Sequence, residues 1–247
     1  MLITEFRITM PMTVEEYQVG MLYGVAKASL EETGGGEGVE VLQNEPFTDV
    51  PLLNGKYSEG QYTNKIYHLE SKVPSIIKYI APAGSLKLTE VAWNAHPHYC
   101  KTVITNPGYM KNNFLLKLET VCKADRGNSE NVHELTQAQL AVRKVVHIDI
   151  ANDPIHQGAG SEFEPGRFTC TKSDPARGPL AGNWKETVTP VMTVYKLITV
   201  EFVWFGLQVS FKGFVIFFLL FSKSTSYRSW FIKYSEERVS NVKMHFF

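Results

Sequence analysis

The chain has 247 residues, enough for one large domain or two small ones. It carries 25 Lys and Arg against 25 Asp and Glu, so no global field attracts it to nucleic acid or to an acidic membrane. Its three cysteines, Cys100, Cys122 and Cys170, are widely spaced and form no Cys-x-x-Cys motif, which favours a reducing cytosolic location. The short, charged N-terminus is not typical of a signal peptide.

The first half of the chain predicts strands with few helices. Leu2–Met10 alternates like a strand, and Thr13 with Glu16 is a capping-box pattern that predicts a helix running to about Leu30. Gly34–Gly38 lacks the Lys-Ser/Thr of a phosphate-binding loop, so it is interpreted as a connector. A short helix is expected at Val73–Ile80. Further strands are expected at Val39–Asn44, Gln61–Glu70, Leu86–Asn94, Cys100–Thr105 and Phe114–Val121.

The second half predicts one more helix and two more strands. Glu134–Lys144 has a helical pattern and leads into a strand at Val145–Ile150. Ala151–Asn183 is polar and rich in Gly and Pro, which indicates a long loop region, and Val191–Phe205 is a long strand. Together these elements predict an α+β fold with a large, mostly antiparallel sheet.

Two polar couplets lie on apolar strand faces. With period-two alternation, Thr63 and Lys65 share one face of their strand, and Glu90 shares a face with Asn94 and with Leu88. A hydroxyl, a cation, a carboxylate and an amide among apolar side chains suit a ligand with a polyhydroxyl, anionic head and an apolar body.

A further lysine, Lys196, is the single charge on an otherwise apolar face of the last strand. A lysine whose stem covers apolar surface while its charge reaches water accounts for this position equally well. The second lysine on such a face, Lys65, favours an interior anion site.

Eleven stretches match one family in the same order along about five sixths of the chain. They are Glu16–Gly20, Gly34–Val41, Asn44–Phe47, Gly60–His68, Ser71–Pro74, Ala92–Ala95, Thr102–Asn106, Arg177–Leu180, Asn183–Lys185, Tyr195–Val200 and Gly206–Gln208. On these stretches the chain resembles the class I phosphatidylinositol transfer proteins.

The resemblance implies a START-like helix-grip fold, in which a curved sheet and helices enclose one lipid cavity. It implies a non-enzymatic monomer, without a cofactor or metal, that carries one phosphatidylinositol or phosphatidylcholine molecule between membranes. It also implies a cytoplasmic protein that is transiently bound at membrane surfaces and possible contact with lipid kinases. By position, Thr63, Lys65, Glu90 and Asn94 match the inositol-binding residues of the family, Cys100, Thr102, Thr120 and Lys196 match other lipid contacts, and Trp204 and Phe205 match the membrane-docking pair.

Some positions depart from the family pattern. Met21 replaces a lipid-contacting glutamine, and Cys170 aligns with a phosphorylatable serine. Asn94–Cys100 is one residue longer than usual, so the placement of Cys100 and Thr102 depends on where the extra residue bulges. Another one-residue insertion lies in Asn106–Tyr109.

The motifs end at Gln208, which divides the chain into a transfer domain, residues 1–208, and an atypical apolar and basic tail, residues 209–247. We interpret the tail as a retained intron or an alternative final exon that replaces the C-terminal lid helix of the family. On this hypothesis the chain is a truncated product that transfers lipid poorly.

Two other functions remain open from the residues. A non-transferring adaptor that presents phosphoinositides would need the same pocket. An enzyme is a weaker alternative, because His96 and His98 would share a face in a regular strand but have no clear third zinc ligand.

Overall fold

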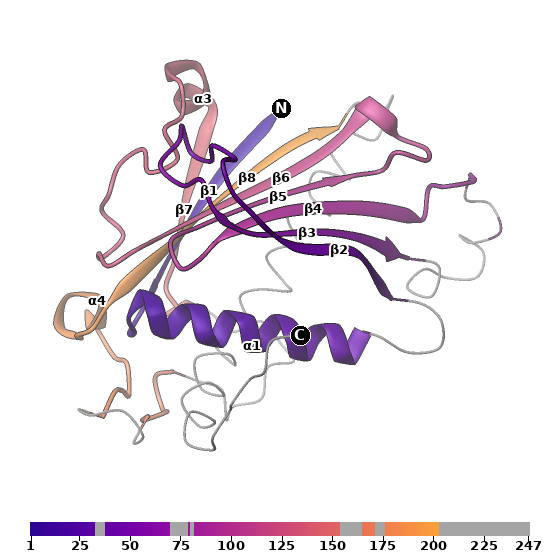
Figure 1. The fold of residues 1–247 in the computed structure, drawn as a ribbon. Coiled ribbons are helices and arrows are strands. Elements are labelled where there is room, and N and C mark those ends of the chain that lie inside the picture. Colours follow the sequence, from indigo (N-terminus) through magenta and orange to yellow (C-terminus); the bar gives the residue numbers. More distant parts are fainter. Residues whose placement is uncertain (33–37, 70–78, 80–81, 154–164, 171–175, 203–247) are drawn as a thin grey trace.

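A computed structural model describes residues 1–32, 38–69, 79, 82–153, 165–170 and 176–202. Within these residues, eight strands form one sheet in the order β2-β3-β4-β5-β6-β8-β1-β7 (Figure 1). Every neighbouring pair is antiparallel except β1 and β7, which run parallel. The predicted α+β class with a mostly antiparallel sheet is therefore confirmed. The strands are β1 (Leu2–Met10), β2 (Val39–Phe47), β3 (Gly60–His68), β4 (Lys87–Ala95), β5 (Tyr99–Thr105), β6 (Phe114–Lys123), β7 (Arg143–Ile148) and β8 (Met192–Phe202).

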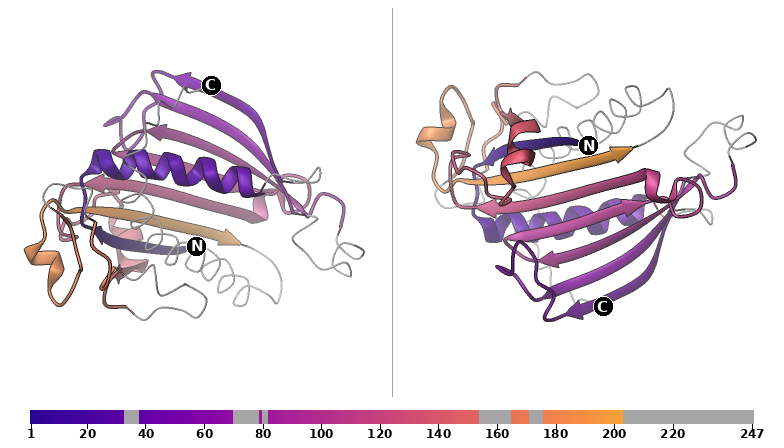
Figure 2. Two further views of the ribbon diagram at one scale, coloured as in Figure 1. Left: turned by 90° about the horizontal axis from the view of Figure 1, so that it is seen from below. Right: turned by 90° about the horizontal axis from the view of Figure 1, so that it is seen from above.

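Helix α1 (Val14–Glu32) lies against one face of the sheet, as Figures 1 and 2 show. The predicted capping box begins it: the Glu16 amide donates to Thr13 Oγ1 at 3.2 Å, and the Thr13 amide donates to Glu16 Oε2 at 2.9 Å. Tyr17 of α1 is buried in the same apolar cluster as Phe6 and Ile198 of the sheet. We call this cluster the main core. We call this sheet face the inner face.

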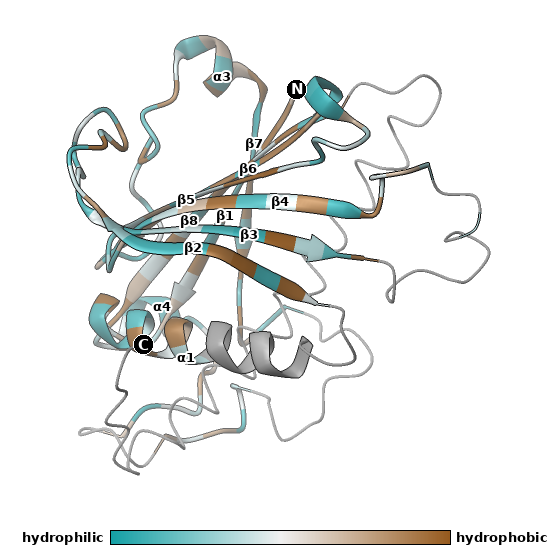
Figure 3. Cartoon of the chain, turned by 45° about the vertical axis from the view of Figure 1, so that its right-hand side comes forward, coloured by the Kyte–Doolittle hydropathy of each residue, from teal (hydrophilic) through white to brown (hydrophobic). Residues whose placement is uncertain are grey.

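Strand alternation assigns residues to the inner face. It carries the even-numbered residues of β1, β4, β5, β6, β7 and β8 and the odd-numbered residues of β3. Figure 3 shows apolar and polar residues alternating along these strands. In β8, the inner-face residues Met192, Val194, Ile198 and Val200 are all buried in the main core, while Lys196 between them is half-buried.

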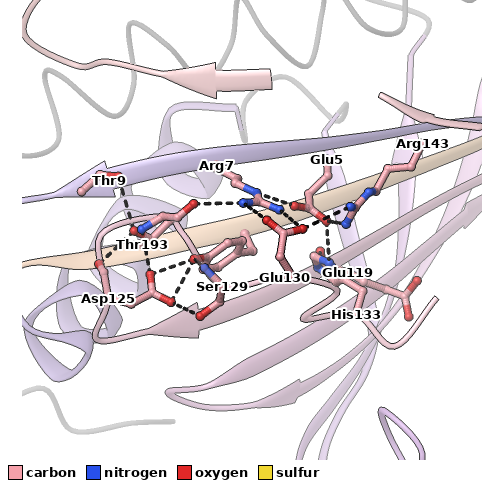
Figure 4. Close-up of polar contacts among 12 residues, drawn as sticks. Glu5, Arg7, Thr9, Glu119, Asp125, Ser129, Glu130, His133, Arg143 and Thr193 are labelled. Atoms are coloured by element: carbon pink, nitrogen blue, oxygen red, sulfur yellow. Dashed lines mark hydrogen bonds and ion pairs between the residues drawn. The ribbon is translucent and has the colours of Figure 1, made fainter. Parts of the chain in front are cut away.

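The outer face of β1 carries charge, yet it is equally buried. Glu5 is fully buried and accepts from Arg7 Nε at 2.7 Å and from Arg143 Nη1 at 2.7 Å. His133 Nδ1 lies 3.5 Å from Glu5 Oε2 (Figure 4). Arg7 also donates from Nη1 to Glu130 Oε1 at 3.2 Å. Each charge is opposed by an opposite one, which is the condition for tolerating ions in an interior.

A second polar cluster adjoins this one on the outer face. Tyr195 donates to Asp125 at 2.8 Å and accepts from the Ser129 amide at 3.0 Å, and Thr193 donates to the Asp125 carbonyl. These bonds fasten the segment after β6 over β1 and β8 (Figure 4). Both faces of the sheet centre are therefore covered, one by α1 and one by this segment.

The predicted helix over Glu134–Lys144 is wrong at both ends. Helix α3 spans only Gln137–Val142, because Thr136 caps it through a capping box with Gln139. Arg143 and Lys144 belong to β7, where they pair with Ile3 and Thr4 of β1. Parallel pairing with β1 and the ion pair from Arg143 to Glu5 outweigh local helix propensity at these two positions.

Most other boundaries match within a few residues. Strand β2 extends to Phe47 through Pro46, which an edge strand tolerates because its amide side can face away from the ladder. The loop region after Ile150 leads to a short helix, α4 (Trp184–Thr187), and one further helical turn, η2 (Lys111–Asn113), precedes β6. The predicted connector Gly34–Gly38 and helix Val73–Ile80 fall almost wholly outside the described residues. No helix in the described part of the chain combines the length and apolar character needed to cross a membrane.

Replacing Glu5 with Gln should reduce stability in a pH-dependent way. Burial alone would raise the Glu5 pKa, but the adjacent His133 ring, the hydrogen bond from Arg7 and the charge of Arg143 lower it to about 2. A carboxylate with a depressed folded-state pKa stabilises the fold above its unfolded pKa near 4.5, on the order of 3 kcal/mol, and this is lost as pH falls towards 2.

Urea unfolding of the wild type and Glu5→Gln between pH 7 and pH 2.5 measures this contribution. The difference in free energy of unfolding should be largest at neutral pH and shrink below pH 4.5. A difference that is independent of pH would show that the Glu5 charge does not stabilise the fold.

Candidate functional site

The strand register places the eight predicted lipid-contacting residues on the inner face. Asn94 pairs with Cys100, Cys100 with Thr120, and Thr120 with Lys196, so these four form one row across β4, β5, β6 and β8. The adjacent row contains Thr63, Ala92 and Thr102. The next row contains Lys65, Glu90 and Ile104.

Lys65 and Glu90 face each other directly across β3 and β4. Lys65 Nζ lies 3.4 Å from Glu90 Oε1, and both side chains are mostly buried, with 18% and 13% of their surface exposed. The other carboxylate oxygen, Oε2, accepts a hydrogen bond from the Tyr67 hydroxyl at 2.9 Å. Burial raises the pKa of Tyr67, and the adjacent Glu90 charge and hydrogen bond raise it further. Tyr67 therefore stays protonated and acts as a donor to Glu90 at neutral pH.

Asn94 is held at the other end of the site by two bonds. Its amide nitrogen donates to the Gln61 carbonyl at 3.3 Å, and its amide oxygen accepts from the Cys100 thiol. Gly60 allows β3 to approach β4 closely beside Asn94, because a Cβ at residue 60 would lie 2.2 Å from the Asn94 carbonyl oxygen. The Asn94 side chain is thus oriented by both neighbouring strands.

The stretch in which an extra residue was expected, Asn94–Cys100, contains the turn between β4 and β5. Residues 96–98 form this turn, with a cis His96–Pro97 bond, and Ala95 pairs with Tyr99 on either side. Cys100 and Thr102 consequently keep their inner-face positions. His96 and His98 lie in the turn and not on a regular strand face, and burial lowers the pKa of His96. Among the described residues, no cluster of three or more metal-ligating side chains occurs.

The site offers hydrogen-bonding groups and a small net charge. In the described part of the chain, the half-buried hydroxyls of Thr63, Thr102 and Thr120 make no hydrogen bond. Across β3, β4, β5, β6 and β8 the inner face carries three charged residues, Lys65, Glu90 and Lys196. Two cations and one anion leave a net charge of +1, which complements a single negative charge such as that of a phosphodiester.

Apolar side chains adjoin these polar rows. Leu88, Ile104 and Leu118 are partly buried and pack against the main core. Leu118 continues the row of Thr63 and Thr102, and Ile104 continues the row of Lys65 and Glu90. The inner face thus changes from polar at β3 and β4 to apolar towards β6 and β8.

The structure adds two residues, Tyr67 and Asn44, that were not among the predicted site residues. Tyr67 shares the inner face with Thr63 and Lys65, so strict alternation along β3 was sufficient to find it. Asn44 of β2 pairs with Thr63 and accepts a 2.7 Å hydrogen bond from Gln61. Its position follows a bulge between Val41 and Gln43, which sequence alternation alone does not reveal. The predicted docking pair, Trp204 and Phe205, lies outside the described residues.

Comparison with known proteins assigns the family. A sequence profile for the family described as "Phosphatidylinositol transfer protein" matches residues 1–236. The chain belongs to the phosphatidylinositol transfer protein family. It is 48% identical over 221 residues to the human phosphatidylinositol transfer protein beta isoform, covering 87% of this chain and 78% of that protein. It is 45% identical over 230 residues to phosphatidylinositol transfer protein 1 of Dictyostelium discoideum, covering 90% and 83% respectively.

Two departures from the family pattern are accommodated in the structure. Met21 packs its apolar side chain against the main core from α1. Cys170 is buried and forms a two-way backbone bridge with Arg177, whose guanidinium holds Glu16 at 2.7 Å. The profile match also extends past Gln208, where the sequence motifs end, but the proposed boundary at 208 lies outside the described residues.

Cys100 and Cys122 should be alkylated at different rates, because their side chains are buried to different extents on the inner face. Burial raises the pKa of the Cys122 thiol to about 12, and Cys100 contributes to the same shift. At pH 8 only on the order of one Cys122 in 10,000 is then a thiolate. Cys100 is half-buried and should react first with iodoacetamide.

Peptide mass spectrometry after timed alkylation at pH 8 compares the two rates. Protein unfolded in urea is the control, in which both thiols should react equally. Native Cys122 reacting as fast as Cys100 would contradict the assigned burial.

Proposed function

We propose that this protein binds one phosphatidylinositol or phosphatidylcholine molecule between the inner face of the sheet and α1, and exchanges it between membranes without covalent chemistry. The observation that carries the proposal is the partly buried set of Thr63, Lys65, Glu90 and Asn94 on the inner face of β3 and β4. Family membership supports it, because the relatives are named for phosphatidylinositol transfer.

The polar residues of the site match the chemistry of an inositol head group. Ring hydroxyls need acceptors and donors in fixed positions, which Glu90, Asn94 and Thr63 supply. The Thr102 hydroxyl on β5 and the Thr120 hydroxyl on β6 share the inner face, where Cys100 pairs with Thr120 and Lys196 follows Thr120 in its row, and these groups would contact the phosphate. Phosphatidylcholine lacks the ring hydroxyls and would rely on the phosphate contacts alone.

The apolar part of the inner face suits acyl chains. A diacyl lipid has about 30 methylenes, so exposing both chains to water would cost on the order of 20 kcal/mol. Contact with Leu88, Ile104 and Leu118 offsets part of that cost. An empty site would leave polar groups such as Thr63 unpaired, which favours exchange of one lipid for another over release into water.

This function requires contact with membrane surfaces. We infer that the protein acts in the cytoplasm and binds membranes transiently, with Trp204 and Phe205 in the headgroup region, where aromatic side chains are favoured. The predicted monomeric state and contacts with lipid kinases stay predictions.

Thr63→Ala and Lys65→Ala should selectively weaken phosphatidylinositol binding. Each removes a contact to the inositol ring from β3, and a lost hydrogen bond to a ring hydroxyl corresponds to roughly a tenfold loss in affinity. Phosphatidylcholine binding should change less than about twofold, since its head group does not use the ring contacts. The ratio of the two lipids bound after incubation with mixed vesicles is measured by mass spectrometry.

The matched control variants are Thr89→Ala and Lys101→Ala, which change the same residue types on the outer face of β4 and β5. Both should keep the wild-type lipid ratio. Equal loss of both lipids in Thr63→Ala and Lys65→Ala would show that these residues support the fold and not the head group.

Purified protein should also carry phospholipid from its expression host in an amount near one molecule per chain. Extraction with organic solvent followed by quantitative mass spectrometry identifies the lipid class and its ratio to protein. Protein that is free of lipid, and that binds none from vesicles, would contradict the proposed function and also the alternative of an adaptor that presents phosphoinositides.

A further inference from the structure

Tyr67 occupies a position that head-group binding alone does not explain. Its hydroxyl lies 2.9 Å from Glu90 Oε2, whereas Lys65 Nζ lies 3.4 Å from the other carboxylate oxygen, Oε1. The Glu90 carboxylate is thus held between two donors, one neutral and one cationic. Tyr67 itself lies two residues after Lys65 on β3 and faces Leu88 across the ladder.

This arrangement determines which way Glu90 points. A carboxylate beside an ammonium group is drawn towards it, because the attraction between the two charges is strong in a mostly buried site. The Tyr67 hydroxyl retains Oε2 by a hydrogen bond to a charged acceptor, the stronger class of hydrogen bond. Each carboxylate oxygen has further lone-pair sites, so both remain able to accept from a ligand hydroxyl. Lys65 is likewise left with donors that Glu90 does not use.

We propose that Tyr67 is a specificity-determining positioning residue, which keeps the Glu90 carboxylate oriented towards the inositol ring and prevents it from pairing fully with Lys65. The inference rests on the proposed function of Glu90 in the head-group site. Because phosphatidylcholine has no ring hydroxyls to present to Glu90, the Tyr67 hydroxyl matters for one lipid and not for the other.

Tyr67→Phe removes only the hydroxyl and tests this role. The phosphatidylinositol bound from mixed vesicles should fall about tenfold relative to phosphatidylcholine, whose binding should stay within about twofold. Tyr62→Phe is the matched control, since Tyr62 lies on the same strand and packs its ring on Trp93 at the outer face. The control should keep the wild-type lipid ratio.

A double-variant cycle with Glu90→Gln separates positioning from general support of the fold. If Tyr67 acts through Glu90, adding Tyr67→Phe to Glu90→Gln should cause no further loss of phosphatidylinositol. Additive losses, or an equal fall in the binding of both lipids for Tyr67→Phe alone, would overturn the proposal. The cycle can still be interpreted if the single variant is less stable than the wild type.

Comparison of Tyr67→Phe with Thr63→Ala separates the role of Tyr67 from the proposed lipid-binding function. A selective loss in Thr63→Ala with a wild-type ratio in Tyr67→Phe would refute the role of Tyr67 and leave the proposed function intact. Wild-type ratios in Thr63→Ala, Lys65→Ala and Tyr67→Phe together would refute the head-group site itself.

Discussion

Antiparallel pairing from β3 to β8 is the interaction on which the site depends. It brings Lys65 opposite Glu90 and aligns Asn94, Cys100, Thr120 and Lys196 in one row. A slip of one residue would move every side chain of the affected strand to the other face. The turn at residues 96–98 therefore matters as much as the binding residues, because the pair of Ala95 and Tyr99 on either side of it sets the register of β5.

The two faces of the sheet use polar groups differently. On the outer face, Glu5 and Arg7 are buried and are paired with oppositely charged neighbours of the fold itself. On the inner face, the Thr63, Thr102 and Thr120 hydroxyls have no partner in the described part of the chain. Hydrogen-bonding capacity that the fold does not use is what a head group requires.

Local patterns in the sequence predicted much of this arrangement. The alternation of apolar and polar residues predicted β1 with the bounds that the structure shows, and the Thr13–Glu16 capping box predicted the start of α1. Alternation also placed Thr63 and Lys65 on one face, but it cannot say which residues of another strand lie opposite them. The pairing of Lys65 with Glu90 depends on long-range register, and so does the helix error at Arg143, where parallel pairing with β1 overrides local propensity. The roles of the eight lipid contacts came from the family resemblance and stay proposals.

Cross-linking of a lipid head group to the protein tests the central claim most directly. Phosphatidylinositol with a photoreactive group on its inositol ring would be loaded into the protein from vesicles and irradiated. The modified peptides, mapped by mass spectrometry, should come from β3 and β4, around Thr63, Lys65, Glu90 and Asn94. Cross-links confined to outer-face segments, such as residues 124–136 or α3, would contradict a head-group site on the inner face.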